Sequence, residues 1–402
     1  MKKRFLLTVL TILALFLNNE AFAKDFSDDS LKYKLIKTTF DYAPIREEAS
    51  RNAVRFTHLK SGVSLYSDKQ TSDFYKVDLG LNKPYWIEKI YIKEDGKSAY
   101  NKSSKVSKIK FYQNKDNYIV KINTKTKTPY KVYQNENGLK FQLYNINVNN
   151  KDLKVKFKDG GKFNYSVKKA NNGSEILTVN YRNNEPIFGY DVENKKELFG
   201  GSLVFSIKKP IKVDSKKPLN KVKIALDAGH GGKECGAVSG GVYEKNINLQ
   251  ITNELNEILK DRGAKTVLTR KKDIDTELYS RVDKARDKNV DIFISIHQNS
   301  LPNPKNWAKK HGSGVYYYNE NAKALAHSIQ RNLVKKTGFR DDGVFNASFA
   351  VIRSTDPVSI LVECGYIIHP YERKKLTDPK FQKIVAAAIA DGVEEYLNNT
   401  AL

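Results

Sequence analysis

The sequence predicts two folded regions of different class, and three observations support this division. Short runs of alternating polar and apolar residues, rich in Tyr, Val, Ile and Phe, fill residues 24–208 and predict an all-β, sandwich-like region. The stretch "KKPIKVDSKKPLNK", which begins at Lys208, interrupts this pattern with two prolines and six lysines. From residue 221 onwards, strands alternate with amphipathic helices, which predicts an α/β domain with a mostly parallel, twisted sheet and helices on both faces.

The β-rich region contains runs such as "FYKVDLGL", "NYIVKIN" and "EILTVNYR", separated by turn sequences such as "NENG", "KDGG" and "NNGS". The polar stretch "KEDGKSAYNKSSK", which begins at Lys93, allows a division of this region into two units. No grouping of His, Cys or paired carboxylates suggests catalysis here. His58 stands alone in this half of the sequence, and we predict that it lies at the surface.

The second region begins after a linker over residues 209–220 and extends over residues 221–398. Its pattern predicts strands at residues 221–228, 264–270, 290–299, 314–319, 349–353 and 359–366. Helices are predicted at residues 246–263, 275–289, 321–338 and 378–399. In open α/β sheets, reactive groups lie beyond the carboxyl ends of the strands, so the residues that follow each strand are the candidates for a functional site.

Three predicted strands end in residues that carry chemistry. His230 follows the first strand inside a glycine-rich turn, His297 closes "FISIHQN", and Glu363 ends "ILVE". Glu244 opens the first predicted helix. Each residue has an ordinary alternative: a strand-end histidine is often a hydrogen-bonded core residue, and a glutamate in the first helical turn complements the helix dipole. Together the four converge on one edge of one sheet, which favours a site.

Two imidazoles and one carboxylate form the ligand set of a catalytic zinc ion, which keeps its fourth position for water. The glycines around His230 allow a sharp turn that directs the imidazole towards such an ion. Hydrolysis also needs a group that moves protons, and Glu363 is the remaining carboxylate at this edge. The alternative for Glu363 is that it caps the turn after its strand. The alternative for "DAGHGG" is that it holds a phosphate, although it lacks the lysine and hydroxyl residue of a P-loop.

The N-terminal sequence "MKKRFLLTVLTILALFLNNEAFAKD" predicts a secretory signal peptide over residues 1–23, cleaved after Ala23. The alternative is an uncleaved anchor, but the apolar run is shorter than the roughly 20 residues that span a bilayer. We therefore expect an exported protein without a membrane span in its mature form. Its compartment is predicted to be the periplasm, with the cell wall or extracellular space as the alternative.

The net charge is +25, and most of the excess lies before residue 220. Nucleic acid is the usual partner of such a basic region, but export favours an anionic envelope polymer or membrane surface instead. The alternative is a lysine-rich, solvated surface without a partner. The two cysteines, Cys235 and Cys364, are too few for a disulfide scaffold. Strand alternation turns Cys364 into the core, and a Cys235–Cys364 disulfide is the alternative.

Several motifs of the second region, in order and approximate spacing, resemble the zinc-dependent N-acetylmuramoyl-L-alanine amidases of the amidase-3 type. These are "LDAGHGG", "GGVYEKNINLQI", "VLTR", "LYSRVDKA", "DIFISIHQN", "GSGVYYY" and "ILVECGYIIHP". The resemblance implies cleavage of the amide between N-acetylmuramic acid and L-alanine in peptidoglycan, in wall remodelling or daughter-cell separation. It places zinc ligands at His230, Glu244 and His297 and the catalytic glutamate at Glu363.

The sequence departs from the family pattern at three positions. Glu234 stands where an aspartate is usual, Cys235 where a small residue or proline is frequent, and Cys364 where an aliphatic residue is common. None of these changes removes a predicted ligand. Some family members carry a helical insertion that blocks the zinc until an activator or divisome protein removes it. Here "GVYYYNENAKALAHSIQ" passes directly from strand to helix, so we expect no block of that kind.

The β-rich region resembles, by pattern and position, the envelope-targeting AMIN-type unit that precedes such catalytic domains, over about residues 105–208. Two other functions remain open from the sequence. One is a zinc peptidase of different bond specificity, which would use the same four residues. The other is a non-catalytic wall-binding protein with a structural zinc, although such a protein would be expected to lack the general base that Glu363 provides.

Overall fold

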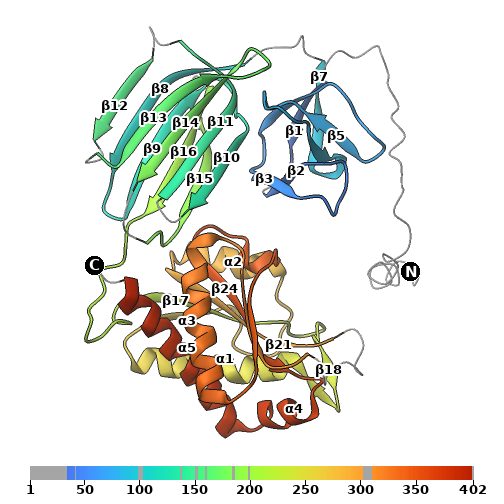
Figure 1. The fold of residues 1–402 in the computed structure, drawn as a ribbon, viewed down its shortest axis with the longest axis vertical. Coiled ribbons are helices and arrows are strands. Elements are labelled where there is room, and N and C mark those ends of the chain that lie inside the picture. Colours follow the sequence, from blue (N-terminus) through green and yellow to red (C-terminus); the bar gives the residue numbers. More distant parts are fainter. Residues whose placement is uncertain are drawn as a thin grey trace.

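The computed structural model describes residues 34–40, 42–97, 103–135, 138–149, 153–158, 161–182, 186–197, 200–301 and 310–400. Two all-β units are followed along the chain by an α/β domain (Figure 1). The predicted signal peptide, residues 1–23, lies outside the described residues. Among the helices of the described ranges, none has the length and apolar character needed to cross a bilayer.

The first β unit consists of two small sheets, with strand orders β4-β1-β7 and β3-β2-β6-β5. Their apolar side chains, among them Ile36, Ile45 and Leu65, are fully buried. The elements are β1 (Lys34–Thr38), β2 (Ala43–Arg46), β3 (Arg55–Leu59), β4 (Ser64–Ser67), β5 (Phe74–Val77), β6 (Tyr85–Glu88), the 3₁₀ turn η2 (Lys89–Tyr91) and β7 (Ile92–Lys97).

The second β unit is a nine-stranded sheet in which β13-β14-β11-β8-β9-β16-β15 follow one another, β10 pairs with β11 and β12 pairs with β8. Phe141 of β11 and Phe205 of β16 have ring centroids 4.4 Å apart although their strands are not neighbours, so the sheet folds over a shared core. The all-β class predicted for this half is therefore correct. The strands are β8 (Ser104–Gln113), β9 (Asn117–Thr124), β10 (Tyr130–Asn135), β11 (Gly138–Val148), β12 (Lys154–Lys158), β13 (Phe163–Lys169), β14 (Glu175–Arg182), β15 (Tyr190–Glu197) and β16 (Gly200–Lys208).

The α/β domain is built on a six-stranded sheet of order β20-β17-β21-β24-β22-β23. Neighbouring strands are parallel except for β22 and β24, which are antiparallel. The strands are β17 (Lys223–Ala228), β18 (Val238–Ser239), β19 (Val242–Tyr243), β20 (Lys265–Leu268), β21 (Ile292–Asn299), β22 (Ser313–Tyr317), β23 (Asp341–Asn346) and β24 (Val358–Tyr366), of which β18 and β19 form a separate hairpin. The helices are α1 (Glu244–Asp261), α2 (Leu278–Asp287), η4 (Glu320–Ala322), α3 (Lys323–Thr337), η5 (Ala350–Ile352), α4 (Pro370–Leu376) and α5 (Pro379–Thr400).

Both faces of this sheet are covered, because alternate side chains of the central strands point to opposite sides. Ile294 of β21 joins the large core that contains the apolar faces of α1, α3 and α5. Phe293, the preceding residue, joins a smaller core with Val282 of α2 and Val351 of η5. Figure 1 shows α1, α3 and α5 together on one side of the sheet.

One predicted strand is wrong. Residues 349–353, "FAVIR", contain the 3₁₀ turn η5, and the edge strand of the sheet is instead β23, whose sequence "DDGVFN" begins with turn-forming residues. Val351 and Ile352 are buried under the sheet beside α2. A short apolar run is compatible with either a buried strand or a buried turn, so periodicity alone does not separate them.

The β units contact the α/β domain at the amino ends of its strands. The Lys208 ammonium, at the end of β16, donates to the carbonyl of Val290 (2.7 Å) and to Asp356 (2.8 Å), which precede β21 and β24. Arg286, at the end of α2, lies 3.3 Å from Asp191 of β15. The carboxyl ends of β17, β21 and β24 therefore face away from the β units, whereas the carboxyl end of the antiparallel strand β22 faces them.

Candidate metal centre

A glycine-rich turn beyond β17 carries the first predicted ligand. His230 has a φ of +59°, in the left-handed region, and Gly231 and Gly232 after it also have positive φ values. Gly229 is needed for a different reason, because a Cβ atom at this position would lie 2.3 Å from the imidazole of His297. The missing side chain thus lets two imidazoles from different strands approach each other, with ring centroids 5.0 Å apart.

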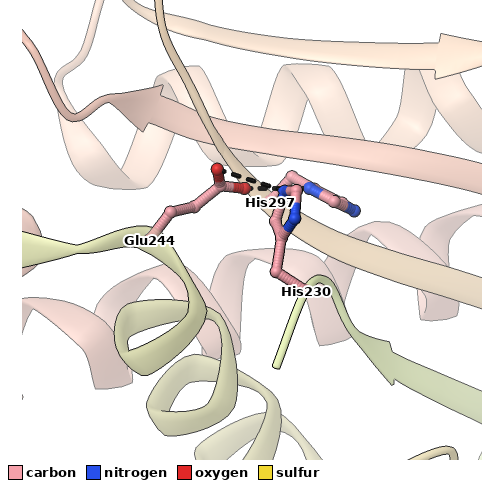
Figure 2. Close-up of side chains that lie close together, drawn as sticks. All are labelled: His230, Glu244 and His297. Atoms are coloured by element: carbon pink, nitrogen blue, oxygen red, sulfur yellow. Dashed lines mark hydrogen bonds and ion pairs between the residues drawn. The ribbon is translucent and has the colours of Figure 1, made fainter. Parts of the chain in front are cut away.

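The three predicted metal ligands lie together. Glu244 Oε1 is 2.9 Å from His297 Nδ1, and Glu244 Oε2 is 3.3 Å from His230 Nε2. One ligand atom from each residue lies within 4.8 Å of the others, and Figure 2 shows the three side chains pointing towards one another. Burial alone would raise the pKa of Glu244, but hydrogen bonds and charge from His230 and His297 lower it below its ordinary value, so the carboxylate is ionised.

Glu363 lies on β24 directly beside His297 of β21, since the two are partners in the parallel register. Its Oε2 atom is shielded from solvent and, among the described residues, has no hydrogen-bond partner. Burial raises the pKa of Glu363 well above its ordinary value, and the nearby carboxylates of Glu244 and Asp342 raise it further. A half-buried carboxyl group with a free oxygen at the end of a strand is suited to exchange protons with a bound molecule.

Two buried arginines hold the turn that carries His230. Arg281 of α2 pairs with Asp227 at 2.8 Å and donates to the carbonyl oxygens of Ala228 (2.8 Å) and His230 (2.9 Å). Arg270, which follows β20, donates to Ala228 and to the next carbonyl along the turn. These bonds satisfy the carbonyl groups of a backbone that is not in regular structure.

Both hydrogen bonds and an ion pair stabilise the buried Asp227 carboxylate. It accepts hydrogen bonds from Thr269 (2.6 Å) and Ser295 (2.7 Å) in addition to the ion pair with Arg281. Burial alone would raise the pKa of Asp227, but the charge of Arg281 and these hydrogen bonds lower it. A fully paired ionic network therefore fixes the turn beneath the candidate ligands.

The residues fit a zinc ion. Two imidazoles and a carboxylate are a frequent donor set for catalytic zinc, and His230, Glu244 and His297 offer it from a turn, a helix terminus and a strand end. Glu363, whose buried Oε2 has no partner among the described residues, lies beside these ligands.

Comparison with known proteins identifies the domain. The family model described as N-acetylmuramoyl-L-alanine amidase matches residues 224–395. The uncharacterized protein YqiI of Bacillus subtilis is 36% identical over 184 residues, which are 45% of this chain and 87% of YqiI. This chain belongs to the N-acetylmuramoyl-L-alanine amidase family. Its members are hydrolases, and all four predicted site residues lie inside the matched range.

Two further relatives of the amidase domain show how much of each protein is shared. The N-acetylmuramoyl-L-alanine amidase LytC of Bacillus subtilis is 36% identical over 185 residues, which are 45% of this chain but only 36% of LytC. The catalytic domain of the amidase CwlV from Bacillus (Paenibacillus) polymyxa var. colistinus is 37% identical, with 44% of this chain and 98% of that chain covered and a TM-score of 0.42. The β-rich region lies outside the family match.

Sequence reasoning missed several residues of the amidase site. Asn248 lies one turn after Glu244 on α1 and donates to Glu244 (3.2 Å) and to the Gly229 carbonyl (3.1 Å). Arg270 and Arg281 fall inside the motifs "VLTR" and "LYSRVDKA", which were recognised without a role for either arginine. The spacing of four residues between Glu244 and Asn248 was an available signal, since such residues share a helix face.

The two cysteines of the amidase domain are both free thiols, so the alternative of a disulfide between them is wrong. Cys364 is fully buried in the main core, as strand alternation predicts. Cys235 is partly exposed on the loop after the His230 turn.

Proposed function

We propose that this protein is a zinc-dependent peptidoglycan hydrolase that cleaves the amide between the lactyl group of N-acetylmuramic acid and L-alanine of the stem peptide. One observation carries the proposal most strongly: three ligand-type side chains meet at one end of the sheet, and beside them lies Glu363, whose Oε2 has no partner among the described residues. Membership of the amidase family supplies the bond specificity.

His230, Glu244 and His297 are the residues that would hold the zinc ion. When bound, zinc lowers the pKa of a water molecule towards neutrality and polarises the carbonyl oxygen of the amide. The chain's own contribution is to fix these ligands before substrate arrives, through the hydrogen bonds of Asn248 and the arginine network under the His230 turn.

Glu363 moves the proton. Its carboxylate accepts a proton from the attacking water while the water oxygen bonds to the carbonyl carbon. The same proton then passes to the alanine nitrogen as the carbon–nitrogen bond breaks, which yields a free amine and a carboxylic acid that then loses its proton to solvent. The buried surroundings of Glu363 and the neighbouring carboxylates increase its affinity for a proton, which is needed for the first step.

Substitution of Glu363 tests this assignment. We expect Glu363→Gln to keep one equivalent of zinc while release of stem peptides from purified sacculi falls by roughly 10²–10⁴-fold, the usual contribution of a general acid–base group. Glu257→Gln, on the exposed face of α1, is the matched control and should leave both zinc content and activity unchanged. Undiminished activity of the Glu363 variant would remove the proposed role.

Two alternatives are separated by their products and by metal removal. A zinc peptidase of different specificity would release fragments without a new N-terminal L-alanine, whereas the amidase reaction exposes that amine on every released peptide. A wall-binding protein with structural zinc would release nothing. Under the proposed function, chelation abolishes release and added zinc restores it.

The β-rich region carries a face suited to an anionic envelope polymer. Lys154 and Lys156 of β12 lie beside Lys108 and Lys110 of β8, and Lys110 also pairs with Lys121 of β9. The charge of Lys110 is the main cause that lowers the pKa of Lys108, and the other three lysines lower it further. Like charges on neighbouring strands destabilise a sheet, so a polyanion is the partner that would offset this repulsion.

Replacement of four lysines tests this partner in the full chain. Changing Lys108, Lys110, Lys154 and Lys156 to Gln should weaken pelleting with sacculi at low salt, because surface charges act over about 10 Å and are screened as salt increases. Equal loss in a control with the same charge change would show that net charge alone matters. The control replaces Lys216, Lys288, Lys335 and Lys380, which are exposed elsewhere.

The proposed activity takes place outside the cytoplasm, at the cell envelope. The signal peptide directs the chain out of the cytoplasm, and the AMIN-like unit, about residues 105–208, brings the amidase domain to the envelope during wall remodelling or daughter-cell separation. In the described residues β22 leads directly through η4 into α3, which supports activity without removal of a helical insertion. An activator or divisome protein would then act on targeting.

A further inference from the structure

A cavity of about 170 Å³ lies where both β units meet the amidase domain. It is lined by Arg55 and His58 of the first unit, Tyr190 of the second, and Tyr318 and Arg353 of the amidase domain. A single buried water needs roughly 10–15 Å³ of such space, so the cavity has room for a polyatomic ligand. It lies at the amino end of β24 and the carboxyl end of the antiparallel β22, and shares no residue with the candidate metal centre.

Two guanidinium groups from different domains line this cavity and converge on one serine. Arg55 Nη1 donates to Ser348 Oγ, and Arg353 Nε donates to the same oxygen (2.9 Å) and its Nη2 to the Ser348 carbonyl (2.8 Å). A hydroxyl group accepts these bonds but carries no charge. Within the part of the chain that the structure describes, neither arginine has a carboxylate partner.

Two carboxylates of this region are engaged by other cations. Glu88 binds Arg46 (3.4 Å) and Arg51 (2.9 Å), which line an adjoining cavity that also contains Arg55. Asp191, on the wall of the first cavity, binds Arg286. Among the described residues, these two positive charges therefore have no carboxylate paired with them at the boundary between the domains.

The imidazole beside these arginines is uncharged. Burial lowers the pKa of His58 to about 3, and the charges of Arg55, Arg353 and Arg46 contribute to this decrease. Its ring lies 6.2 Å from that of Tyr318 on the amidase domain. The neutral histidine adds no further positive charge, and its suppressed protonation is consistent with a positive field in the cavity.

We propose that this cavity is a binding site for a phosphate dianion, which bridges Arg55 and Arg353 and stabilises the docking of the first β unit on the amidase domain. Guanidinium groups present paired donors that match the oxygens of phosphate. A dianion neutralises both arginines at once, whereas a carboxylate or a phosphodiester supplies only one negative charge. The proposal is independent of the catalytic function, since the cavity shares no residue with the metal centre.

Calorimetric titration of the full chain with sodium phosphate at pH 8, in phosphate-free buffer of matched ionic strength, tests the site. We expect one phosphate per chain in the wild type and at least about 10-fold weaker binding in both Arg55→Gln and Arg353→Gln, since each substitution removes a positive charge and its charge-assisted hydrogen bonds to the dianion. Arg331→Gln, which alters an exposed arginine of α3, is the control and should bind phosphate as the wild type does.

The outcomes distinguish the possible sources of the phosphate group and test the role of the two arginines. Glycerol phosphate that binds as tightly as inorganic phosphate supports a phosphomonoester ligand, and its exclusion supports free phosphate. Acetate that binds as tightly as phosphate, no phosphate binding by the wild type, or unchanged binding in both arginine variants overturns the proposal. The last result would mean that phosphate binds elsewhere on the protein, for example at the metal centre. In phosphate-free buffer, neither arginine variant should have a lower Tm than the wild type, because each substitution removes the repulsion between Arg55 and Arg353. A lower Tm in both variants would indicate that the arginines have a purely structural role.

Discussion

Two pairs of arginines lie at opposite ends of the strands of the amidase sheet, here called the carboxyl edge and the amino edge after the ends of β21 and β24. The two pairs differ in the groups that accept their hydrogen bonds. Arg270 and Arg281 lie at the carboxyl ends of the strands, fully buried, where Asp227 and several carbonyl groups accept their hydrogen bonds. Arg55 and Arg353 lie at the amino ends, partly exposed, and share a serine. The first pair includes an ion pair with a buried carboxylate, whereas the second pair has no carboxylate partner among the described residues.

This difference indicates two uses of the same side chain. At the carboxyl edge, the arginines are internal supports, because Arg281 pairs with the buried Asp227 and both arginines donate to the carbonyl groups of the His230 turn. At the amino edge, the incomplete neutralisation favours an external anion and leaves docking of the β units dependent on it. Substitutions that remove one partner should therefore have opposite consequences at the two edges.

The largest effect is expected at the carboxyl edge. Arg281→Gln leaves Asp227 buried without its ion-pair partner, and breaking such a pair destabilises a fold by about 3–5 kcal/mol. Denaturation by urea, followed by circular dichroism, measures the loss. Arg353→Gln is the comparison, and it should change the free energy of unfolding much less. Similar losses in the two variants would contradict the distinction between supporting and anion-binding arginines.

A smaller effect is expected from the close approach of two imidazoles. In Gly229→Ala, the new methyl group would lie 2.3 Å from His297, so the ring must move away from its position beside Glu244. We expect zinc affinity to fall by roughly 10–100-fold, the usual cost of disturbing groups that orient metal ligands. Competition with a chromogenic chelator gives the affinity. Gly241→Ala, where a Cβ would contact nothing within 4 Å, is the control for backbone strain.

The sequence was sufficient to predict the candidate ligands because each is marked by its place in a regular pattern. His230 and His297 end strands, and Glu244 begins a helix, so the topology of an α/β sheet brings them to one edge. Arg270 and Arg281 carry no such mark, since their partners are carbonyl groups and a carboxylate that only the folded chain brings within reach. Composition and periodicity do not contain that information.

The amino edge was harder to predict for the same reason. His58 was expected at the surface, because nothing near it in the sequence suggests a partner. In the structure it lines the cavity between domains, and its neighbours include Tyr318 and Arg353 from the other half of the chain. Likewise, the strand expected at residues 349–353 is a 3₁₀ turn, and this turn places Arg353 opposite Arg55. Contacts between domains depend on docking, which leaves no periodic signal.

The smallest effect concerns His58 and the pH dependence of stability. Because burial and the nearby arginines lower its pKa in the folded state to about 3, the unfolded chain binds a proton as pH falls below about 6.5 while the folded protein does not. Stability that is present above pH 6.5 is therefore lost as pH falls towards 3, by at most about 1.4 kcal/mol per pH unit. In His58→Gln this contribution disappears. Urea denaturation of both proteins between pH 6.5 and 5, a range chosen to lie above the ordinary titration of most carboxyl groups, should show a steeper decrease for the wild type. Parallel curves would mean that His58 is solvated in the folded protein, and the cavity between the domains would then be open to water at this residue.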